Sequence, residues 1–196
     1  MATFISHSPA ETESLGETWG RSAQSGLVIG LSGDLGAGKT RLVKGLARGL
    51  GITARVYSPT FALVNIYEGG RLPLYHLDLY RMDTIDQILS AGLEEYLQPQ
   101  GVTVIEWAER WFGTGTGTTD YGTTGLRDHG LRTTDHRPQT ADQGLQLPIT
   151  DHQSPVTDHR SPITSHQSPI TPHLFHVRLE TLSETERRIT YEDPGP

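Results

Sequence analysis

The chain has 196 residues, enough for one domain of ordinary size, and its formal net charge is −7. This acidic balance provides no general basic field, so we expect any RNA to be reached through a partner protein. The absence of cysteine excludes disulfides and thiolate metal sites. No apolar stretch approaches the roughly 20 residues that span a bilayer, and the segment from Met1 to Pro9 lacks the features of a secretory signal. We therefore expect a cytoplasmic protein without membrane attachment.

The elements predicted by apolar periodicity and turn residues alternate between helices and strands. In chain order they are a helix over 11–24, a strand over 27–32, a helix over 38–49, extended segments over 56–67 and 72–79, a helix over 84–97, a strand over 102–106, and closing strands near 174–180 and 187–192. Glu68, Gly69 and Gly70 form a hairpin signal between the two extended segments. The order predicts an α/β fold, a three-layer sandwich of the P-loop NTPase type around a central, mainly parallel sheet.

The segment from 33 to 40 reads Gly-Asp-Leu-Gly-Ala-Gly-Lys-Thr, a complete Walker A sequence between a predicted strand and helix. Its glycines let backbone N–H groups face phosphate oxygens at a helix N-terminus, where an anion is favoured. Lys39 would reach the β and γ phosphates, and the Thr40 hydroxyl would bind Mg²⁺. The alternative is an ordinary glycine-rich turn, which seldom has both flanks correct. The predicted nucleotide site comprises Gly33, Asp34, Leu35, Gly36, Ala37, Gly38, Lys39, Thr40 and Arg41.

The segment from 113 to 172 differs in composition from the rest of the chain. Only 10 of its 60 residues are apolar, so it buries too little surface to offset the entropy of ordering. A seven-residue repeat brings one proline per copy from Pro148 to Pro169, which forbids a continuous helix. We predict a disordered, low-complexity insertion within a P-loop ATPase domain formed by 1–112 and 173–196.

The same repeat spaces His152, His159, His166 and His173 seven residues apart. One interpretation is a weak His/Asp tract for divalent metals. The other is that a short DNA repeat expanded inside a tolerant loop and copied its histidine along. The second is favoured because flexible coil does not preorganise metal ligands.

A phosphate-binding loop needs a metal partner, and the apolar strand over 102–106 ends in Glu106, as Walker B strands end in an acid. Glu106 would hold Mg²⁺ directly or through water, or polarise the attacking water; the alternative is a surface glutamate at a strand end. His76, Asp78 and Tyr80 alternate with apolar residues and share one strand face. They form either an acid/base or metal-organising cluster or a solvated strand face.

Two further features each leave two interpretations. Trp107, directly after Glu106, is either a core aromatic or part of the site. Ser58-Pro59-Thr60-Phe61 offers two hydroxyls beside a fixed turn, and it is either a loop with a switch-like threonine or simply a turn.

Four motifs, in this order and spacing, resemble the bacterial TsaE family. They are Gly33 to Thr40, Ser58 to Phe61, His76-Leu-Asp-Leu-Tyr-Arg81 and Ile105-Glu-Trp107. The resemblance covers essentially the whole chain except 113–172. It implies an ATPase, slow alone, that is needed for threonylcarbamoyladenosine (t6A) synthesis in tRNA beside the anticodon. It also implies the TsaD–TsaB assembly as partner, with tRNA reached through that complex, and ATP hydrolysis that resets the assembly between turnovers.

The resemblance assigns roles to the residues of these motifs. It implies that Lys39 and Thr40 bind ATP and Mg²⁺, and that Glu106 is the second acid of the metal site. It implies that Asp78 is important for hydrolysis, and it places Thr60 in a switch-like loop near the γ-phosphate. The expected cofactors are therefore ATP and Mg²⁺, and the expected catalytic residues are Asp78, Glu106, Lys39 and Thr60.

Other polar residues are candidates for contact with the nucleotide. Thr12 matches a family position near the nucleotide, and a helix N-cap is its alternative role. Arg187 or Arg188 in the closing strands is a candidate nucleotide contact. Arg81 and Arg110 are candidates for an arginine finger, although a group supplied by the partner would better explain slow turnover.

Two alternatives belong to other functional classes. A small-molecule P-loop kinase usually has an acceptor pocket and a basic lid, but the segment over 113–172 has four arginines, no lysine and a net charge of −2. A nucleotide-dependent assembly switch would bind ATP in the same way, with hydrolysis incidental to its action.

Overall fold

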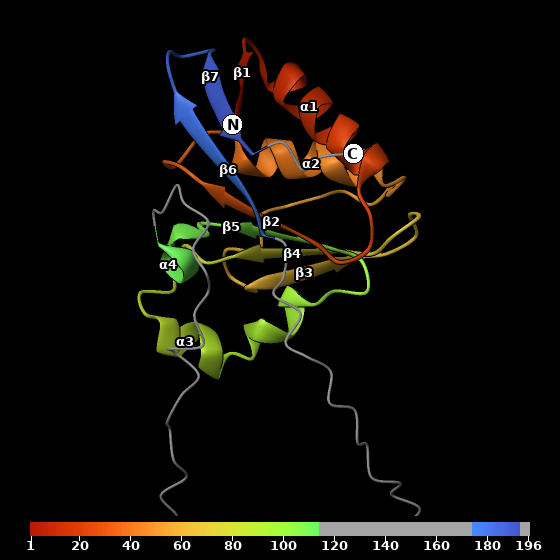
Figure 1. Ribbon diagram of the computed structural model, residues 1–196, viewed down its shortest axis with the longest axis vertical. Helices are drawn as coiled ribbons and strands as arrows, with labels where there is room; N and C mark the ends of the chain where they lie inside the picture. The colour runs from red at the N-terminus through yellow and green to blue at the C-terminus, as the bar shows by residue number, and fades with distance from the viewer. Residues whose placement is uncertain (114–173, 193–196) are drawn as a thin grey trace, which may run out of the picture. The chain divides into compact units, whose positions relative to one another are not determined.

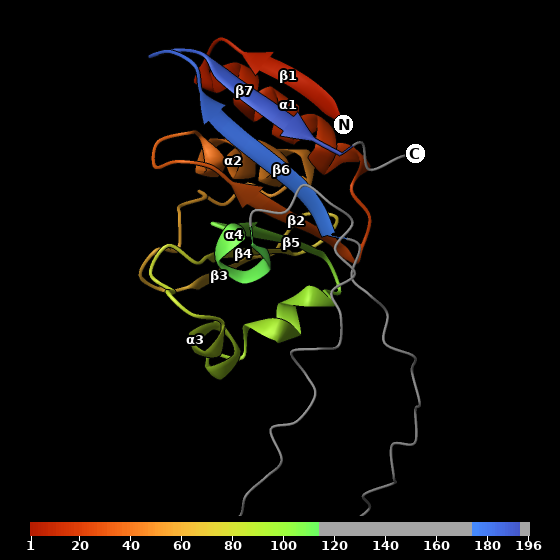
Figure 2. The same ribbon diagram turned by 60° about the vertical axis from the view of Figure 1, so that its left-hand side comes forward.

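A computed structural model describes residues 1–113 and 174–192, all within one compact unit. A seven-stranded sheet lies between two layers of helices, α1 and α2 on one face and α3, η1 and α4 on the other (Figures 1 and 2). The three-layer α/β fold predicted from the sequence is therefore confirmed. The predicted disordered insertion over 113–172 and its histidine repeat lie outside the described residues, apart from Gly113.

The elements have the following bounds in chain order: β1 Ala2–Ser6, α1 Pro9–Ser22, β2 Leu27–Ser32, α2 Lys39–Gly49, β3 Val64–Tyr67, β4 Leu74–Asp78, α3 Ile85–Ser90, the 3₁₀ helix η1 Leu93–Leu97, β5 Val102–Glu106, α4 Glu109–Phe112, β6 Leu174–Thr181 and β7 Arg187–Tyr191. The strands expected over 27–32 and 102–106 are confirmed at both ends. The helix expected over 84–97 is instead two short helices, because Gly92, with φ at 69°, interrupts it.

The strand order is β1-β7-β6-β2-β5-β4-β3. The central strands β6, β2, β5 and β4 pair in parallel. The pairs β1–β7, β7–β6 and β4–β3 are antiparallel, so all strands except β3 and β7 point the same way. The sheet is thus mixed and mostly parallel, and the carboxyl ends of β2, β5 and β4 meet at one edge. Open parallel sheets bind their ligands at such an edge.

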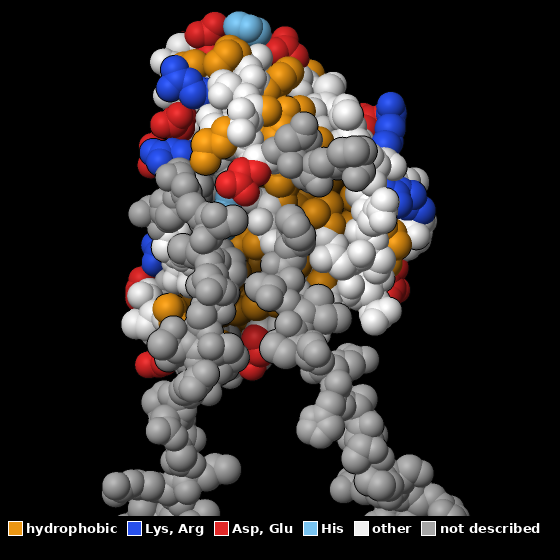
Figure 3. All heavy atoms as spheres, in the orientation of Figure 1, with side chains coloured by type: hydrophobic (Ala, Val, Ile, Leu, Met, Phe, Trp, Pro, Cys, Tyr) orange, Lys and Arg blue, Asp and Glu red, His pale blue; other side chains and the backbone are white. Residues whose placement is uncertain are grey.

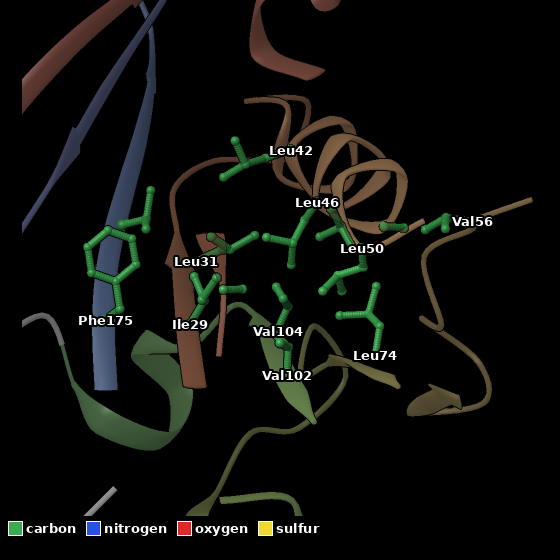
Figure 4. Packing of buried hydrophobic residues seen from close by; sticks show 14 of the residues in the cluster. Ile29, Leu31, Leu42, Leu46, Leu50, Val56, Leu74, Val102, Val104 and Phe175 are labelled. Carbon is green, nitrogen blue, oxygen red and sulfur yellow. The ribbon is translucent and has the colours of Figure 1, made fainter. Parts of the chain in front are cut away.

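The main core lies between the sheet and α2. Figure 4 shows Leu46 and Leu50 pointing from the helix towards Val104 and Leu74 of the sheet. Truncating one of these buried leucines to alanine would cost about 2–5 kcal/mol of stability. A second buried cluster on the opposite face of the sheet includes Ile88 and joins α3, η1 and α4 to it. The main core fixes α2, and hence the loop before it, against the sheet.

The helices α1 and α2 touch through glycines. A Cβ at Gly45 would stand 1.9 Å from the carbonyl oxygen of Glu13, and one at Gly16 would stand 2.2 Å from that of Leu42. Larger residues at these positions would push the two helices apart.

Among residues 1–113 and 174–192, no helix has both the length and the apolar character needed to cross a membrane.

Candidate active site

The Walker A loop joins β2 to α2, in the strand–loop–helix context expected from the sequence. Its backbone enters the left-handed region at Gly33, Gly36 and Gly38, with φ of 131°, 82° and 103°. A Cβ at Gly33 would stand 2.1 Å from the carbonyl oxygen of Leu179, whereas one at Gly36 would meet nothing within 4 Å. The first glycine therefore serves packing against β6, and the second leaves the loop open on its outer side.

Lys39 begins α2 and is only 5% exposed. Its ammonium group donates to the carbonyl oxygens of Gly33 at 2.6 Å and Asp34 at 3.0 Å. It also lies 3.7 Å from the ring centroid of Trp107. Burial lowers the pKa of Lys39 below its ordinary value, and Glu106 opposes this lowering most strongly among the acidic neighbours. Within the part of the chain that the structure describes, the cation is thus held by loop carbonyls and has no ion pair with a carboxylate.

Thr40 in the first turn of α2 and Glu106 at the end of β5, the two residues expected to hold Mg²⁺, lie next to each other. The Thr40 hydroxyl donates to Oε1 of Glu106 at 2.8 Å. Nε2 of His76 lies 2.8 Å from the same oxygen. Glu106 is 3% exposed and His76 is fully buried, so the interpretation of Glu106 as a surface glutamate is wrong.

Asp78 stands opposite Glu106 in the parallel register of β4 and β5. Its Oδ2 accepts hydrogen bonds from Thr60 at 2.7 Å and from the hydroxyl of Ser58. Its Oδ1 accepts the backbone N–H of Tyr80 at 2.9 Å. Asp78 is 2% exposed, so the solvated-face interpretation is wrong for Asp78 and His76. The carboxylate connects the Ser58–Thr60 loop to the end of β4.

The segment expected to be extended over 56–67 is a strand only over Val64–Tyr67. The preceding residues form the loop that Asp78 holds. The loop carries Phe61 on its outer side, 84% exposed, with the Arg81 guanidinium 4.2 Å from its ring centroid. In place of a longer strand, this loop brings the hydroxyls of Ser58 and Thr60 to the buried carboxylate of Asp78.

Trp107 lies both against the core and beside Lys39 of the candidate site. It packs against the second core cluster, and its ring lies over Lys39 and 5.1 Å from that of Tyr80. Its φ of 61° is unusual for a residue other than glycine and costs about 1–3 kcal/mol. Such strain is typical of residues held in place at functional sites.

Thr12 is buried beside the loop, with its methyl group 3.9 Å from where a Cβ on Gly38 would lie. Its hydroxyl is 2.8 Å from that of Ser6. The proposed role of Thr12 as a helix cap is wrong, because Ser8 caps α1 and accepts the N–H of Glu11. The nucleotide contact of Thr12 stays a prediction.

The candidate arginines occupy different settings. Arg187 reaches the carbonyl oxygen of Gly36 at 3.4 Å, whereas Arg188 pairs with a glutamate of β6. Arg110 donates to the carbonyl of Met82 at 2.8 Å, and its guanidinium lies 6.0 Å from the ring centroid of Trp107. Arg41 is exposed and pairs with a glutamate of α1.

The protein oxygens at the strand ends suit Mg²⁺ only together with phosphate. Among residues 1–113 and 174–192, no three or more His, Asp or Glu side chains are grouped to hold a metal ion. Thr40 and Glu106 supply a hydroxyl and a carboxylate, which are the hard oxygen donors that Mg²⁺ takes. This ion usually adds substrate phosphates and water to one or two protein ligands. The donor set therefore fits Mg²⁺ carried in with a nucleotide.

Comparison with known proteins bears directly on this site. A sequence model of the family described as "Threonylcarbamoyl adenosine biosynthesis protein TsaE" matches residues 6–129, more than half of the chain. The chain belongs to the TsaE family. The match includes the Walker A loop, the Ser58–Thr60 loop, and the strands that carry Asp78 and Glu106.

Relatives named tRNA threonylcarbamoyladenosine biosynthesis protein TsaE are similar over about half of this chain. The Synechocystis sp. protein is 50% identical over 103 residues, covering 50% of this chain and 65% of its own length. The Bacillus subtilis protein is 50% identical over 100 residues, covering 51% and 62%. The Treponema pallidum protein is 46% identical over 106 residues, covering 54% and 78%. The chain thus spans less than two thirds of the first two TsaE proteins.

A solved structure is similar to this fold. The crystal structure of Bacillus subtilis YdiB aligns with a TM-score of 0.58 and 27% sequence identity, covering 99% of this chain and 86% of that one.

Two contacts at the site of this TsaE-family chain were not predicted from the sequence. The first is the bond between His76 and Glu106, and the second is the stacking of Lys39 on Trp107. Only the parallel pairing of β4 with β5 would have revealed the first.

Proposed function

We propose that this TsaE-family chain is a cytoplasmic, Mg²⁺-dependent ATPase that supports t6A modification of tRNA. Membership of the family supports the role in the t6A pathway. The observation that supports the ATPase is the contact at 2.8 Å between Glu106 and Thr40, the last residue of the Walker A sequence. A phosphate loop, a hydroxyl and a buried carboxylate at one sheet edge are the parts that nucleotide hydrolysis needs.

The loop and Lys39 would bind the phosphates. Residues 33–38 provide backbone N–H groups at the start of α2, where the helix dipole favours an anion. Lys39 is now bonded to two loop carbonyls, and a phosphate oxygen is a stronger acceptor for its ammonium group. Binding of ATP would therefore draw Lys39 away from at least one of these carbonyls.

Thr40 and Glu106 would hold the Mg²⁺ that accompanies ATP. The bound cation would offset charge on the phosphates during hydrolysis. Thr40 would offer an oxygen lone pair to the cation, and Glu106 would contribute its negative charge from the end of β5. Because both groups are at least partly shielded from water, their electrostatic effect is stronger than at an open surface.

Asp78 and Thr60 would organise the water side. A hydroxyl has one proton and two lone pairs, and Thr60 donates its proton to Asp78. Its oxygen lies 2.8 Å from that of Ser58 and keeps a lone pair that can orient a water molecule. Asp78 thus fixes the direction in which Thr60 accepts, and it is the loop around Thr60 that would sense the γ-phosphate.

The partners we propose are TsaD and TsaB, with tRNA reached through their complex. The net charge of −7 supports this indirect route. In Figure 3, Lys and Arg side chains are interspersed with Asp and Glu along the upper-left edge, so charge of both signs is mixed there. Phosphate transfer would serve the assembly and not the attachment of the threonylcarbamoyl group.

Phosphate release from ATP, measured with and without Mg²⁺ and without any added acceptor, tests the catalytic part of this proposal. We expect slow, Mg²⁺-dependent release that Lys39→Ala and Glu106→Ala each abolish. Release that requires a small-molecule acceptor would favour the P-loop kinase. If Glu106→Ala abolishes release but leaves t6A formation intact, hydrolysis is dispensable and the assembly switch is the better description.

A further inference from the structure

His76 is a fully buried polar side chain that the proposed chemistry does not use. It lies on β4 two residues before Asp78, on the face that α2 covers. Nε2 lies 2.8 Å from Oε1 of Glu106, while Nδ1 is buried and has no hydrogen-bond partner among the described residues. A histidine placed only to fill the core would not need a carboxylate at this distance.

The surroundings of the ring indicate which nitrogen carries the proton. With the proton on Nε2, the ring donates to the carboxylate of Glu106 and leaves only a lone pair unpaired at Nδ1. With the proton on Nδ1, two lone pairs would face each other at 2.8 Å and a buried N–H would have no acceptor. Of the two neutral tautomers, the one with its proton on Nε2 is therefore favoured.

Two donors converge on one oxygen of Glu106. Oε1 accepts from the Thr40 hydroxyl and from His76, each at 2.8 Å. If Thr40 turns its oxygen towards a cation, the bond from His76 remains and holds the carboxylate in the same place. A ligating carboxylate is commonly oriented by a hydrogen bond of this kind.

We infer that His76 is a positioning residue: its Nε2–H fixes the Glu106 carboxylate at the place where Mg²⁺ is held. The inference rests on the proposed function, since it takes Glu106 as the metal-site acid. His76 touches neither nucleotide nor metal in this account, and its effect passes through Glu106. Loss of the bond should weaken Mg²⁺ binding and leave metal-free nucleotide binding in place.

The test compares three variants of the full chain. His76→Leu removes the donor and replaces the ring with an apolar side chain of similar bulk. His76→Gln keeps an N–H group near the position of Nε2. Thr103→Val is the matched control, because Thr103 is equally buried on the neighbouring strand β5 and donates to the carbonyl oxygen of Tyr96 at 2.7 Å. It removes a buried hydrogen bond of the same sheet without touching Glu106.

The measurements are the Mg²⁺ concentration for half-maximal binding of a fluorescent ATP analogue, its affinity in EDTA, and thermal unfolding. We expect His76→Leu to raise the half-maximal Mg²⁺ concentration by about 10-fold or more and to leave the affinity in EDTA unchanged. His76→Gln should restore most of the Mg²⁺ response. Thr103→Val should lower the unfolding temperature and leave the half-maximal Mg²⁺ concentration unchanged. An unchanged Mg²⁺ response in His76→Leu, or an equal shift in Thr103→Val, overturns the inference.

A second measurement on the metal-free protein keeps the two proposals apart. Nitrogen NMR of labelled histidine in the wild-type chain should show the His76 proton on Nε2, and a proton on Nδ1 overturns the inference. This readout also decides the case if His76→Leu does not fold. If the wild-type chain binds no ATP analogue at all, the proposed function is contradicted. The bond from His76 to Glu106 is then judged by the NMR measurement alone.

Discussion

Asp78 is the residue whose role depends most on its particular hydrogen bonds. Its two carboxylate oxygens accept hydrogen bonds from Ser58, Thr60 and the backbone N–H of Tyr80. Asp78 acts only as an acceptor in these bonds. Asp78→Asn removes the negative charge and leaves one carbonyl oxygen where two carboxylate oxygens now accept three hydrogen bonds, so it should loosen the loop. We expect phosphate release to fall by about 100-fold or more, with ATP affinity changed only a few-fold.

A matched variant separates this effect from a general loss of charge. Asp86→Asn changes an exposed aspartate in the first turn of α3 and should leave phosphate release near the wild-type rate. Steady-state kinetics and ATP binding on both variants supply the measurement. Equal activity of Asp78→Asn and wild type would contradict the role given to Asp78.

Lys39 should make stability depend on pH in the alkaline range. Its folded-state pKa is lowered from 10.5 by burial, so between the two pKa values the unfolded chain binds more protons than the folded one. Stability therefore rises with pH through the window just below 10.5, as the buried ammonium loses its charge. Urea unfolding of the wild type and of Lys39→Met at several pH values measures this. The free energy of unfolding of the wild type should rise relative to that of the variant as pH rises. A relative decrease would contradict the burial of a charged Lys39.

Residues that lie next to each other in the sequence were easier to predict than pairs across strands. The Walker A loop was recognisable because Gly33 to Thr40 are consecutive. The pairing of Thr40 with Glu106 was predicted from the need for a metal acid. The contact of His76 with Glu106 was not, since it depends on which strand β5 pairs with. Hydroxyl bonds from Ser58 and Thr60 to Asp78 likewise require the folded loop.

At the scale of elements, α1 and α2 are held closely together by glycine. Alanine is the better helix former by about 1 kcal/mol, so Gly45→Ala would stabilise a free helix. In this chain a Cβ at Gly45 stands 1.9 Å from the carbonyl oxygen of Glu13, and such overpacking costs about 1–3 kcal/mol or more. We therefore expect a net loss of stability, measured as a lower urea midpoint.

The neighbouring position Lys44 provides the comparison on the same helix. Lys44→Ala places alanine at a half-buried position and should change stability by no more than about 0.5 kcal/mol. If Gly45→Ala is as stable as the wild type, the close approach of the two helices is wrong.

Elements with a strong local pattern were the ones predicted well. β2 and β5 are continuous apolar runs, and α2 repeats leucine every four residues, so their bounds followed from the sequence. β1 was missed because it is held by pairing with β7, far along the chain. α4 was missed because four residues are too few to show a helical period.

At the scale of the whole molecule, the segment over 113–172 should be dispensable for ATP binding and stability. Its composition predicts disorder, and the residues on either side lie close together, with the rings of Phe112 and His176 at 6.4 Å. Replacing the segment with a short Gly/Ser linker should leave the unfolding temperature and ATP affinity nearly unchanged. A large loss of either quantity would contradict the predicted disorder.

The central claim is that this chain supports t6A formation through its nucleotide site. The most direct measurement is a reconstitution with TsaD, TsaB, tRNA and the threonylcarbamoyl donor, in which t6A is quantified over several turnovers. We predict that sustained t6A formation requires both this chain and ATP, and that Lys39→Ala does not replace the wild type. Equal t6A formation without the chain, or with Lys39→Ala in its place, would contradict the account.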